Sequence, residues 1–426
     1  MLNHRFFLII PMIVILCVAC SKKPMTEDQI VQMAQQIHQR ALTLDTHVDI
    51  AGERYATEAL DPGVDNPLLR CDLVKMVKGG MDGVFLVVYV GQRDGGLDTE
   101  SYQRAYETAK ARFEAIHRLT KMYPDRCELV TSPNDFQRVI QTEKRAIMIG
   151  IENGYPIGED LSHLKEFYNL GGRYVTLSHG DHNQICDSSS PDEPLHNGLS
   201  DFGRKVVAEM NRLGMMVDVS HISEKSFWDV IDVSKAPIIA SHSGVSAINE
   251  HDRNLTDEQL RVLKQNGGVI QIIALGSFLK EETPEHREAI EKLRIELELP
   301  TWREVRRMSR EEREALMPKY VEFEKRRTEI EKTISGTTLS DMVDHIDHAV
   351  KIAGIDHVGV GTDFDGGFGP EDAVLGCARA EELEDLPGHF AAAGFAPEAV
   401  EKIFGGNWIR VLDAAFPAGG TEEIRP

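Results

Sequence analysis

The chain has 426 residues, of which 42% are hydrophobic and 27% are charged, so it can bury a substantial core in one large domain or two ordinary ones. Its formal net charge of −22 argues against binding to the phosphate backbone of a nucleic acid. In chain order, a short apolar N-terminal segment precedes a long region in which strand and helix patterns alternate.

The first twenty residues, MLNHRFFLIIPMIVILCVAC, are typical of an export signal. The apolar run that starts at Phe6 is too short for a comfortable transmembrane helix, and Pro11 interrupts it. It ends in Val18-Ala19-Cys20-Ser21, which resembles a bacterial lipobox, where the cysteine is lipidated and becomes the new N-terminus. Cys17 stands where an aliphatic residue is usual, so an ordinary cleaved signal is the alternative.

We therefore expect three segments outside the main domain: a lipoprotein signal peptide at 1–20, a tether and N-terminal helix at 21–40, and a C-terminal tail at 417–426. A lipid on Cys20 would anchor the protein to the bacterial cell envelope, facing the periplasm or in the outer membrane. In such an oxidising compartment the remaining cysteines are equally compatible with disulfides and with buried free thiols.

Between residues 41 and 416, short apolar runs alternate with helical patterns, which predicts βα units and a parallel sheet. Eight such runs occur, at 41–47, 83–90, 145–153, 173–179, 215–221, 236–242, 268–275 and 357–365. Helices are expected at 101–121, 200–213, 223–233, 256–266, 339–353 and 392–416. The pattern predicts a (β/α)8 TIM-type barrel of the α/β class. An open doubly wound sheet is the competitor, but no GxGxxG motif follows the first strand.

The gap between the seventh and eighth predicted strands is much longer than the others. Within it, segment 280–335 is rich in Glu, Arg and Lys, with Leu, Ile and Val at periodic positions. The pattern predicts an inserted helical hairpin, which would be either a lid or a solvent-exposed decoration.

Histidine and carboxylate side chains lie at the ends of six of the eight predicted strands. His47 and Asp49 share one face of a strand, because successive strand side chains point to opposite faces. The carboxyl ends of barrel strands converge on one face, so the groups from all six strands are expected to meet there. The convergent residues are His47, Asp49, Glu152, Asn153, His179, His221, His242, Asp363 and Asp365.

Such a cluster predicts a metal site, because these groups would repel one another or stay unsatisfied if they were buried without a cation. Mixed imidazole and carboxylate ligands suit Zn²⁺, with Mn²⁺ and Fe²⁺ as alternatives. Five ligands are too many for one catalytic site with an open position, which favours two ions bridged by Glu152. The first ion would bind His47, Asp49 and Glu152, and the second would bind Glu152, His221 and His242.

Two ions about 3.5–4 Å apart would hold a hydroxide between them as nucleophile and would polarise a carbonyl. Asp363 then remains free to take the proton from that water and to pass it to a leaving amine. His179 is expected to stabilise the oxyanion.

At these residues the sequence resembles the membrane dipeptidase (renal dipeptidase) family of the metal-dependent amidohydrolase superfamily. The matching motifs run in family order along 41–416: THVD (46–49), GIEN (150–153), TLSH (176–179), VDVSH (217–221), SHSG (241–244), RN (253–254), GTDFDG (361–366) and GGNWIRV (405–411).

The resemblance implies a zinc-dependent dipeptidase that cleaves L-X-L-X or L-X-D-X dipeptides and binds two Zn²⁺ per subunit. It also implies that Arg253 binds the terminal carboxylate of the substrate, next to Asn254. Relatives are often homodimers. Two alternatives remain open: a dinuclear amidohydrolase for another small amide or lactam, and a non-catalytic metal-binding lipoprotein.

Overall fold

The computed structural model describes residues 26–92, 96–305, 308–331, 333–334, 336–366 and 372–415. The expected signal peptide, Cys20 and the expected tail at 417–426 lie outside these residues. Among the helices that are described, none is both long enough and apolar enough to cross a membrane.

The described strands form one parallel sheet in the order β1-β2-β4-β5-β6-β7-β8-β9, with a short extra strand, β3, paired with β4. All eight predicted strands are present, and β3 was not predicted. The strands are β1 Leu44–Asp49, β2 Gly83–Tyr89, β3 Cys127–Leu129, β4 Arg145–Glu152, β5 Gly172–Thr176, β6 Met216–Asp218, β7 Ile239–Ser243, β8 Val269–Ile272 and β9 Val358–Val360.

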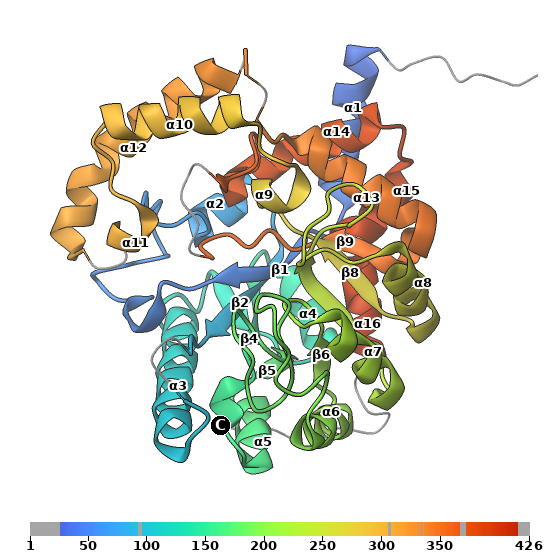
Figure 1. Ribbon diagram of the computed structural model, residues 1–426. Helices are drawn as coiled ribbons and strands as arrows, with labels where there is room; N and C mark the ends of the chain where they lie inside the picture. Colours follow the sequence, from blue (N-terminus) through green and yellow to red (C-terminus); the bar gives the residue numbers. More distant parts are fainter. Residues whose placement is uncertain are drawn as a thin grey trace, which may run out of the picture.

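The sheet closes into a barrel through the residues that follow β9. The amide of Asp363 donates to the carbonyl of His47 at 2.9 Å, and the amide of Asp49 donates to the carbonyl of Phe364 at 2.8 Å. These bonds join the last strand region to the first, so the (β/α)8 prediction is confirmed (Figure 1).

Helices surround the barrel and cover the outer faces of its strands (Figure 1). The described α-helices, including those that lie elsewhere, are α1 Glu27–Arg40, α2 Leu73–Lys78, α3 Thr99–Met122, α4 Pro133–Ile140, α5 Leu161–Asn169, α6 Asp201–Leu213, α7 Glu224–Val233, α8 Asp257–Asn266, α9 Gly276–Leu279, α10 Pro284–Glu296, α11 Trp302–Val305, α12 Arg310–Glu331, α13 Leu339–Ala353, α14 Leu386–Ala392, α15 Pro397–Glu401 and α16 Asn407–Ala415. With helices outside and packed side chains inside, the strands are buried on both faces, which explains their almost continuous apolar sequences.

The inside of the barrel is filled by side chains from successive strands. Phe85 packs edge-on against Trp408 of α16, with ring centroids 5.2 Å apart, and Tyr174 lies 6.1 Å from the same indole. Helix α16 therefore covers the amino-terminal end of the barrel and leaves the carboxyl end open for chemistry. The buried cluster comprises Leu44, Phe85, Val130, Phe136, Val139, Ala146, Met148, Tyr174, Met216, Ile239, Val269, Trp408, Val411, Leu412 and Ala415.

The segment predicted as a helical insertion contains α10, α11 and α12, which lie to one side of the barrel (Figure 1). It has a small apolar core of its own, made by Ile290, Leu293, Leu299 and Phe323. Buried Arg327 of α12 donates to the carbonyl of Ala373 at 2.7 Å, so the insertion is fastened to the segment that follows the barrel's last strand.

Several predicted boundaries differ from the structure, and two of the differences bear on the fold and the site. The single helix expected at 392–416 is divided into the end of α14, α15, a one-turn π-helix at Lys402–Gly406 and α16. The continuous strand expected at 357–365 is limited to β9, because Asp363 has a left-handed backbone with φ 64°. Beyond β9 the chain still pairs with β1 through Asp363 and Phe364.

Candidate metal centre

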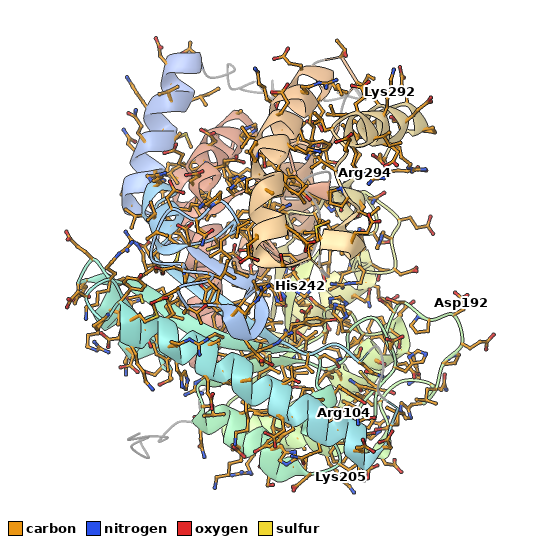
Figure 2. All side chains as sticks on the ribbon, turned by 90° about the vertical axis from the view of Figure 1, so that its left-hand side faces the viewer. Arg104, Asp192, Lys205, His242, Lys292 and Arg294 are labelled. Atoms are coloured by element: carbon orange, nitrogen blue, oxygen red, sulfur yellow. The ribbon has the colours of Figure 1, made fainter. Side chains whose placement is uncertain are left out.

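The carboxyl ends of the strands bring the predicted histidines and carboxylates together inside the molecule. His242, on β7, lies deep within the molecule in Figure 2, whereas Arg104, Asp192 and Lys205 lie at its surface. His47, Asp49 and Asp363 lie near one another, as do His47, Glu152 and His242, and Glu152, His179 and His221. All seven predicted metal and catalytic residues therefore belong to one cluster.

His47 has one ring nitrogen committed to hydrogen bonding and one without a partner. The hydroxyl of Tyr174 lies 2.9 Å from His47 Nδ1 and donates its own proton to the carbonyl of Thr46. The Tyr174 oxygen then accepts from Nδ1–H, so Nε2 is the nitrogen left for a cation. Burial disfavours the charged ring, but the charge of Glu152 outweighs burial and raises the pKa of His47 to about 9, so a cation would displace a proton from Nε2. Nε2 is buried and has no hydrogen-bond partner among the described residues, as expected of an imidazole prepared to bind a cation.

Glu152 lies at the centre of the cluster. One of its carboxylate oxygens, Oε1, is 3.0 Å from Nε2 of His221, 3.4 Å from Nε2 of His242, 3.7 Å from Nε2 of His47 and 3.8 Å from Nε2 of His179. A carboxylate with imidazoles around it can bridge two cations, which is the role expected for Glu152.

The remaining carboxylates lie on the His47 side of the cluster. Asp49 Oδ2 is 3.8 Å and Asp363 Oδ1 is 3.9 Å from His47 Nε2. Asp363 and His179 are thus close enough to join a metal coordination sphere, although the sequence suggested proton-transfer and oxyanion roles for them. The residues fit a metal centre of imidazole and carboxylate ligands.

The electrostatics of the cluster also fit a cation. Burial lowers the pKa values of His221 and His242 well below 6.5, so both are neutral at pH 7 and can offer lone pairs. Their Nε2 atoms face each other at 2.9 Å. Burial raises the pKa of Asp363 to about 7, and burial together with the charge of Glu152 raises the pKa of Asp49. A bound cation would replace the protons that these carboxyls otherwise retain.

Three of the cluster's backbone positions have the left-handed conformation that non-glycine residues rarely adopt. The φ angles are 76° at Asn153, 69° at His221 and 64° at Asp363. Asn153 is held there by its own side chain, which donates to the carbonyl of Val90 at 2.9 Å and accepts the amide of Tyr155 at 3.2 Å. Strain of this kind persists where surrounding contacts fix it, and it turns His221 and Asp363 away from the continuing strand direction.

Sequence reasoning missed the buried residues that support the ligands. Asp218 accepts the amides of Ser220 and Ser241 at 3.1 and 2.9 Å, and the hydroxyl of Ser241 lies 2.8 Å from His242 Nδ1. Asp45 accepts the amides of His47 and Thr362, and burial raises its pKa to about 6. The available signal was an aspartate inside an apolar strand, as in LDTH and VDVSH, because unpaired buried acids are rare.

Arg253 and Asn254 lie in the loop between β7 and α8. The Arg253 side chain is buried, which lowers its pKa to about 10, and it donates to the carbonyl of His242 at 3.2 Å. The amide group of Asn254 donates to the carbonyls of Asn249 and Phe278 at 2.9 and 2.7 Å.

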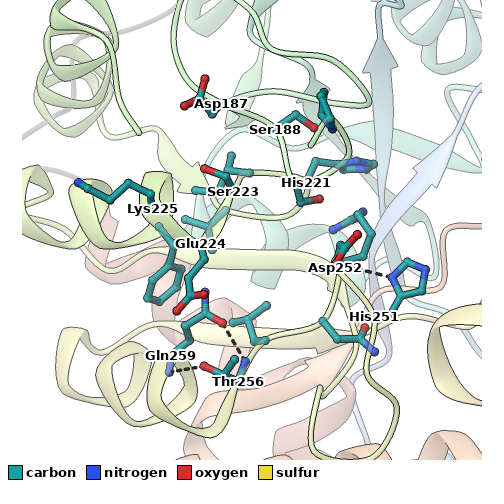
Figure 3. Close-up of a pocket in the computed structure, with 18 of the residues that line it drawn as sticks. Asp187, Ser188, His221, Ser223, Glu224, Lys225, His251, Asp252, Thr256 and Gln259 are labelled. Atoms are coloured by element: carbon teal, nitrogen blue, oxygen red, sulfur yellow. Dashed lines mark hydrogen bonds between the residues drawn. The ribbon is translucent and has the colours of Figure 1, made fainter. Parts of the chain in front are cut away.

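A cavity of about 430 Å³ opens between this loop and the loop that precedes α6. Figure 3 shows His221 and His251 among its lining residues, and Arg253 also lines it. The cavity therefore connects the predicted carboxylate-binding arginine with a predicted metal ligand, and a small substrate can bind there.

Comparisons with known proteins identify the family. The family model described as membrane dipeptidase (peptidase family M19) matches residues 31–421. Dipeptidase tcpJ of Claviceps purpurea (strain 20.1) is 33% identical over 343 residues, which are 80% of this chain and 68% of that protein. Dipeptidase verJ of Clonostachys rogersoniana is 29% identical over 354 residues, with 82% and 76% covered.

Solved structures have the same fold. The probable dipeptidase PvdM from Pseudomonas aeruginosa superposes with a TM-score of 0.75 at 27% identity, over 92% of this chain and 99% of that one. A metallopeptidase from Rhodobacter sphaeroides, solved with a phosphinate mimic of the dipeptide L-Ala-D-Ala, gives a TM-score of 0.66 at 22% identity, over 88% and 99%. The chain belongs to the membrane dipeptidase family, peptidase family M19, and is a metal-dependent dipeptidase.

Proposed function

We propose that this metallo-dipeptidase uses two Zn²⁺ ions and hydrolyses L-X-L-X and L-X-D-X dipeptides. The observation that carries the proposal is the position of Glu152, whose Oε1 lies 3.0–3.8 Å from four imidazole nitrogens. That arrangement, with Asp49 beside His47, favours two cations sharing one carboxylate. Nitrogen-rich ligands of this kind favour Zn²⁺ over Mg²⁺ or Ca²⁺.

When bound, the two ions would supply Lewis-acid activation of a water and of the scissile carbonyl. Asp363 lies next to His47, and burial raises its pKa to about 7, which suits a group that takes a proton from the attacking water and returns it to the leaving amine. His179 is neutral at pH 7 because burial lowers its pKa, and it can donate an N–H to the carbonyl oxygen as negative charge develops there.

Arg253 would hold the substrate's terminal carboxylate. Only its Nη2 has a hydrogen bond among the described residues, to the carbonyl of His242, and its Nε is buried without a partner there. A planar guanidinium with free N–H groups binds a carboxylate by two parallel hydrogen bonds. This anchor would place the dipeptide so that its single peptide bond reaches the metal centre.

The test is a metal analysis combined with a substrate panel. Purified protein loaded with Zn²⁺ should contain two equivalents per chain and should cleave stereochemically varied dipeptides.

The substrate panel should include dipeptides that contain lysine, since the cavity also has acidic lining residues, namely Asp187, Asp192, Glu224, Glu250 and Asp252. Cleavage of a lactam or another amide in place of dipeptides would favour the second enzymatic alternative. Bound metal with no turnover of any substrate would favour a non-catalytic role.

The protein's location is a separate proposal that rests on the sequence of residues 1–21 alone. We propose that Cys20 is lipidated and anchors the enzyme to the cell envelope. In a bacterial host, the wild-type protein should incorporate radiolabelled palmitate and fractionate with membranes. Cys20→Ser should abolish both, whereas Cys17→Ser should change neither. Equal labelling of the Cys20→Ser protein would contradict the proposal.

A further inference from the structure

The buried guanidinium of Arg253 has few hydrogen bonds for its depth. Arg253 is 7% exposed, yet the described hydrogen bonds of its side chain amount to one, from Nη2 to the carbonyl of His242 at 3.2 Å. A long side chain held by one hydrogen bond can rotate, and a guanidinium that rotates cannot keep two parallel N–H donors directed at a carboxylate. Another contact must therefore restrict the guanidinium.

That contact is an aromatic ring from a distant part of the chain. The Arg253 guanidinium lies over the ring of Phe278 in α9, with its central carbon 5.4 Å from the ring centroid, within the range of a cation–π interaction. The His251 ring packs on Phe278, with centroids 4.3 Å apart and planes inclined by 40°. His251 Nδ1 also accepts the backbone amide of Arg253 at 3.1 Å. Phe278 thus contacts both Arg253 and the ring that holds its backbone.

Two carboxamides fix Phe278 in this place. Asn254 donates to the Phe278 carbonyl at 2.7 Å, and Asn249 donates to the same carbonyl and to that of Ser277, both at 3.1 Å. Both asparagines belong to the loop that carries Arg253, so the loop and α9 are joined at the residue whose ring contacts the guanidinium. The orientation of Arg253 therefore depends on α9 as well as on its own loop.

We propose that Phe278 and His251 are positioning residues that hold Arg253 in the orientation needed to bind the substrate's terminal carboxylate. The inference rests on the carboxylate-binding role proposed for Arg253. Phe278 does not belong to the described lining of the cavity, so it acts through Arg253 and not by touching the substrate.

The test compares a change in the protein with a change in the substrate. Phe278→Leu keeps an apolar side chain at a half-buried position but removes the ring face. For a free dipeptide, KM should rise about three- to tenfold with kcat nearly unchanged, as loss of a cation–π contact implies. For the same dipeptide with a C-terminal amide, kcat/KM should not change, because that substrate has no carboxylate for Arg253 to bind.

Three further variants guard against a merely structural explanation. Phe278→Tyr keeps the ring face, so its KM for the free dipeptide should equal the wild-type value. His251→Gln keeps a hydrogen-bond acceptor but removes the ring, so it should raise KM for the free dipeptide and not for the amide. Phe395→Leu changes another half-buried Phe, far from Arg253 along the chain, and should leave both substrates unaffected. The Zn²⁺ content of each variant should equal that of the wild type.

An equal loss on the free dipeptide and on its amide would overturn the inference, as would unchanged KM in both Phe278→Leu and His251→Gln. If Phe278→Leu does not fold, Phe278→Met, which also lacks a ring face, takes its place, because His251 itself lines the cavity. Failure of the proposed function gives a different result: the wild-type enzyme would then cleave no dipeptide, or would not prefer the free carboxylate over the amide.

Discussion

At the scale of single residues, the metal centre depends on which ring nitrogen of each histidine already has a hydrogen-bond partner. His47 Nδ1 is held by Tyr174, and Ser241 lies beside His242 Nδ1, so the Nε2 atoms of both histidines are directed at Glu152. Hydrogen bonds on the outer nitrogen fix the tautomer and the ring orientation of a ligating histidine. The ligand geometry is thus built before any cation arrives.

Asp363→Asn tests the proton-transfer role. The amide is similar in size and cannot accept a proton, so we expect Zn²⁺ content to remain at the wild-type level and kcat to fall about 10²–10⁴-fold. The measurement is dipeptide hydrolysis together with metal analysis. Asp365→Asn is the matched control, because the Asp365 carboxylate accepts the amides of Arg70 and Cys71 instead of facing His47. Wild-type turnover in Asp363→Asn would refute the role.

Arg253→Ala tests recognition of the substrate carboxylate. Removing the guanidinium should raise KM for free dipeptides by about ten- to a hundredfold, the equivalent of hydrogen bonds to a charged group. The same change should have little effect on C-terminally amidated dipeptides. Steady-state kinetics with both substrates measure the difference, and equal losses would mean that Arg253 serves the fold and not the carboxylate.

At the scale of elements, the loop between β5 and α6 forms one wall of the cavity and is organised by one buried carboxylate. Asp187 accepts the amides of Leu195, His196 and Gly198, each at 2.9 Å. Burial alone would raise the pKa of Asp187, but these donors outweigh it and hold the pKa below its ordinary value. The carboxylate therefore stabilises the folded loop.

Asp187→Asn should lower the free energy of unfolding by about 2 kcal/mol at pH 7, because hydrogen bonds to a charged acceptor become bonds to a neutral one. The folded pKa lies below the unfolded value of about 3.9, so this contribution is fully present above pH 4 and is lost as pH falls through the folded pKa. Denaturant unfolding of both proteins from pH 7 to pH 3 measures it. A stability difference that persists unchanged at pH 3 would contradict the assignment.

At the scale of the whole molecule, the carboxylates of Asp49, Glu152 and Asp363 lie together around His47, where bound cations would neutralise their charge. A ligand that binds the folded state and not the unfolded chain adds to stability. Metal binding should therefore contribute to the fold as well as to catalysis.

Removal of the metal by a chelator should lower the melting temperature and abolish dipeptide hydrolysis. Two equivalents of Zn²⁺ should restore both, whereas Mg²⁺ should restore neither, since it prefers oxygen ligands in octahedral geometry. Calorimetry and activity on the same samples are the measurements. A metal-free preparation that melts at the original temperature and stays active would contradict a metal role in either property.

Much of this molecule could be predicted because its signals are local. Continuous apolar runs such as GVFLVVYV mark strands buried on both faces, and the residues at their ends converge because all barrel strands are parallel. The capping box of Thr256 with Gln259 likewise marks the start of α8.

What could not be predicted depends on partners far apart in sequence. The contact of Tyr174 with His47 joins residues 127 positions apart, and Phe278 of α9 contacts Arg253 in the loop between β7 and α8. Strand β3 has three residues and no distinctive pattern. The π-helix at Lys402–Gly406 lies where Gly405 packs closely on the backbone of Leu42, a crowding that composition does not reveal.

The seam that closes the barrel has a consequence for biosynthesis. The hydrogen bonds between His47 and Asp363 and between Asp49 and Phe364 join residues made early to residues made more than three hundred positions later. A growing polypeptide carries most of its histidine ligands long before the ribosome reaches Phe364. The full cluster, with Asp363 beside His47, forms only after that residue has emerged and the first and last strands have met.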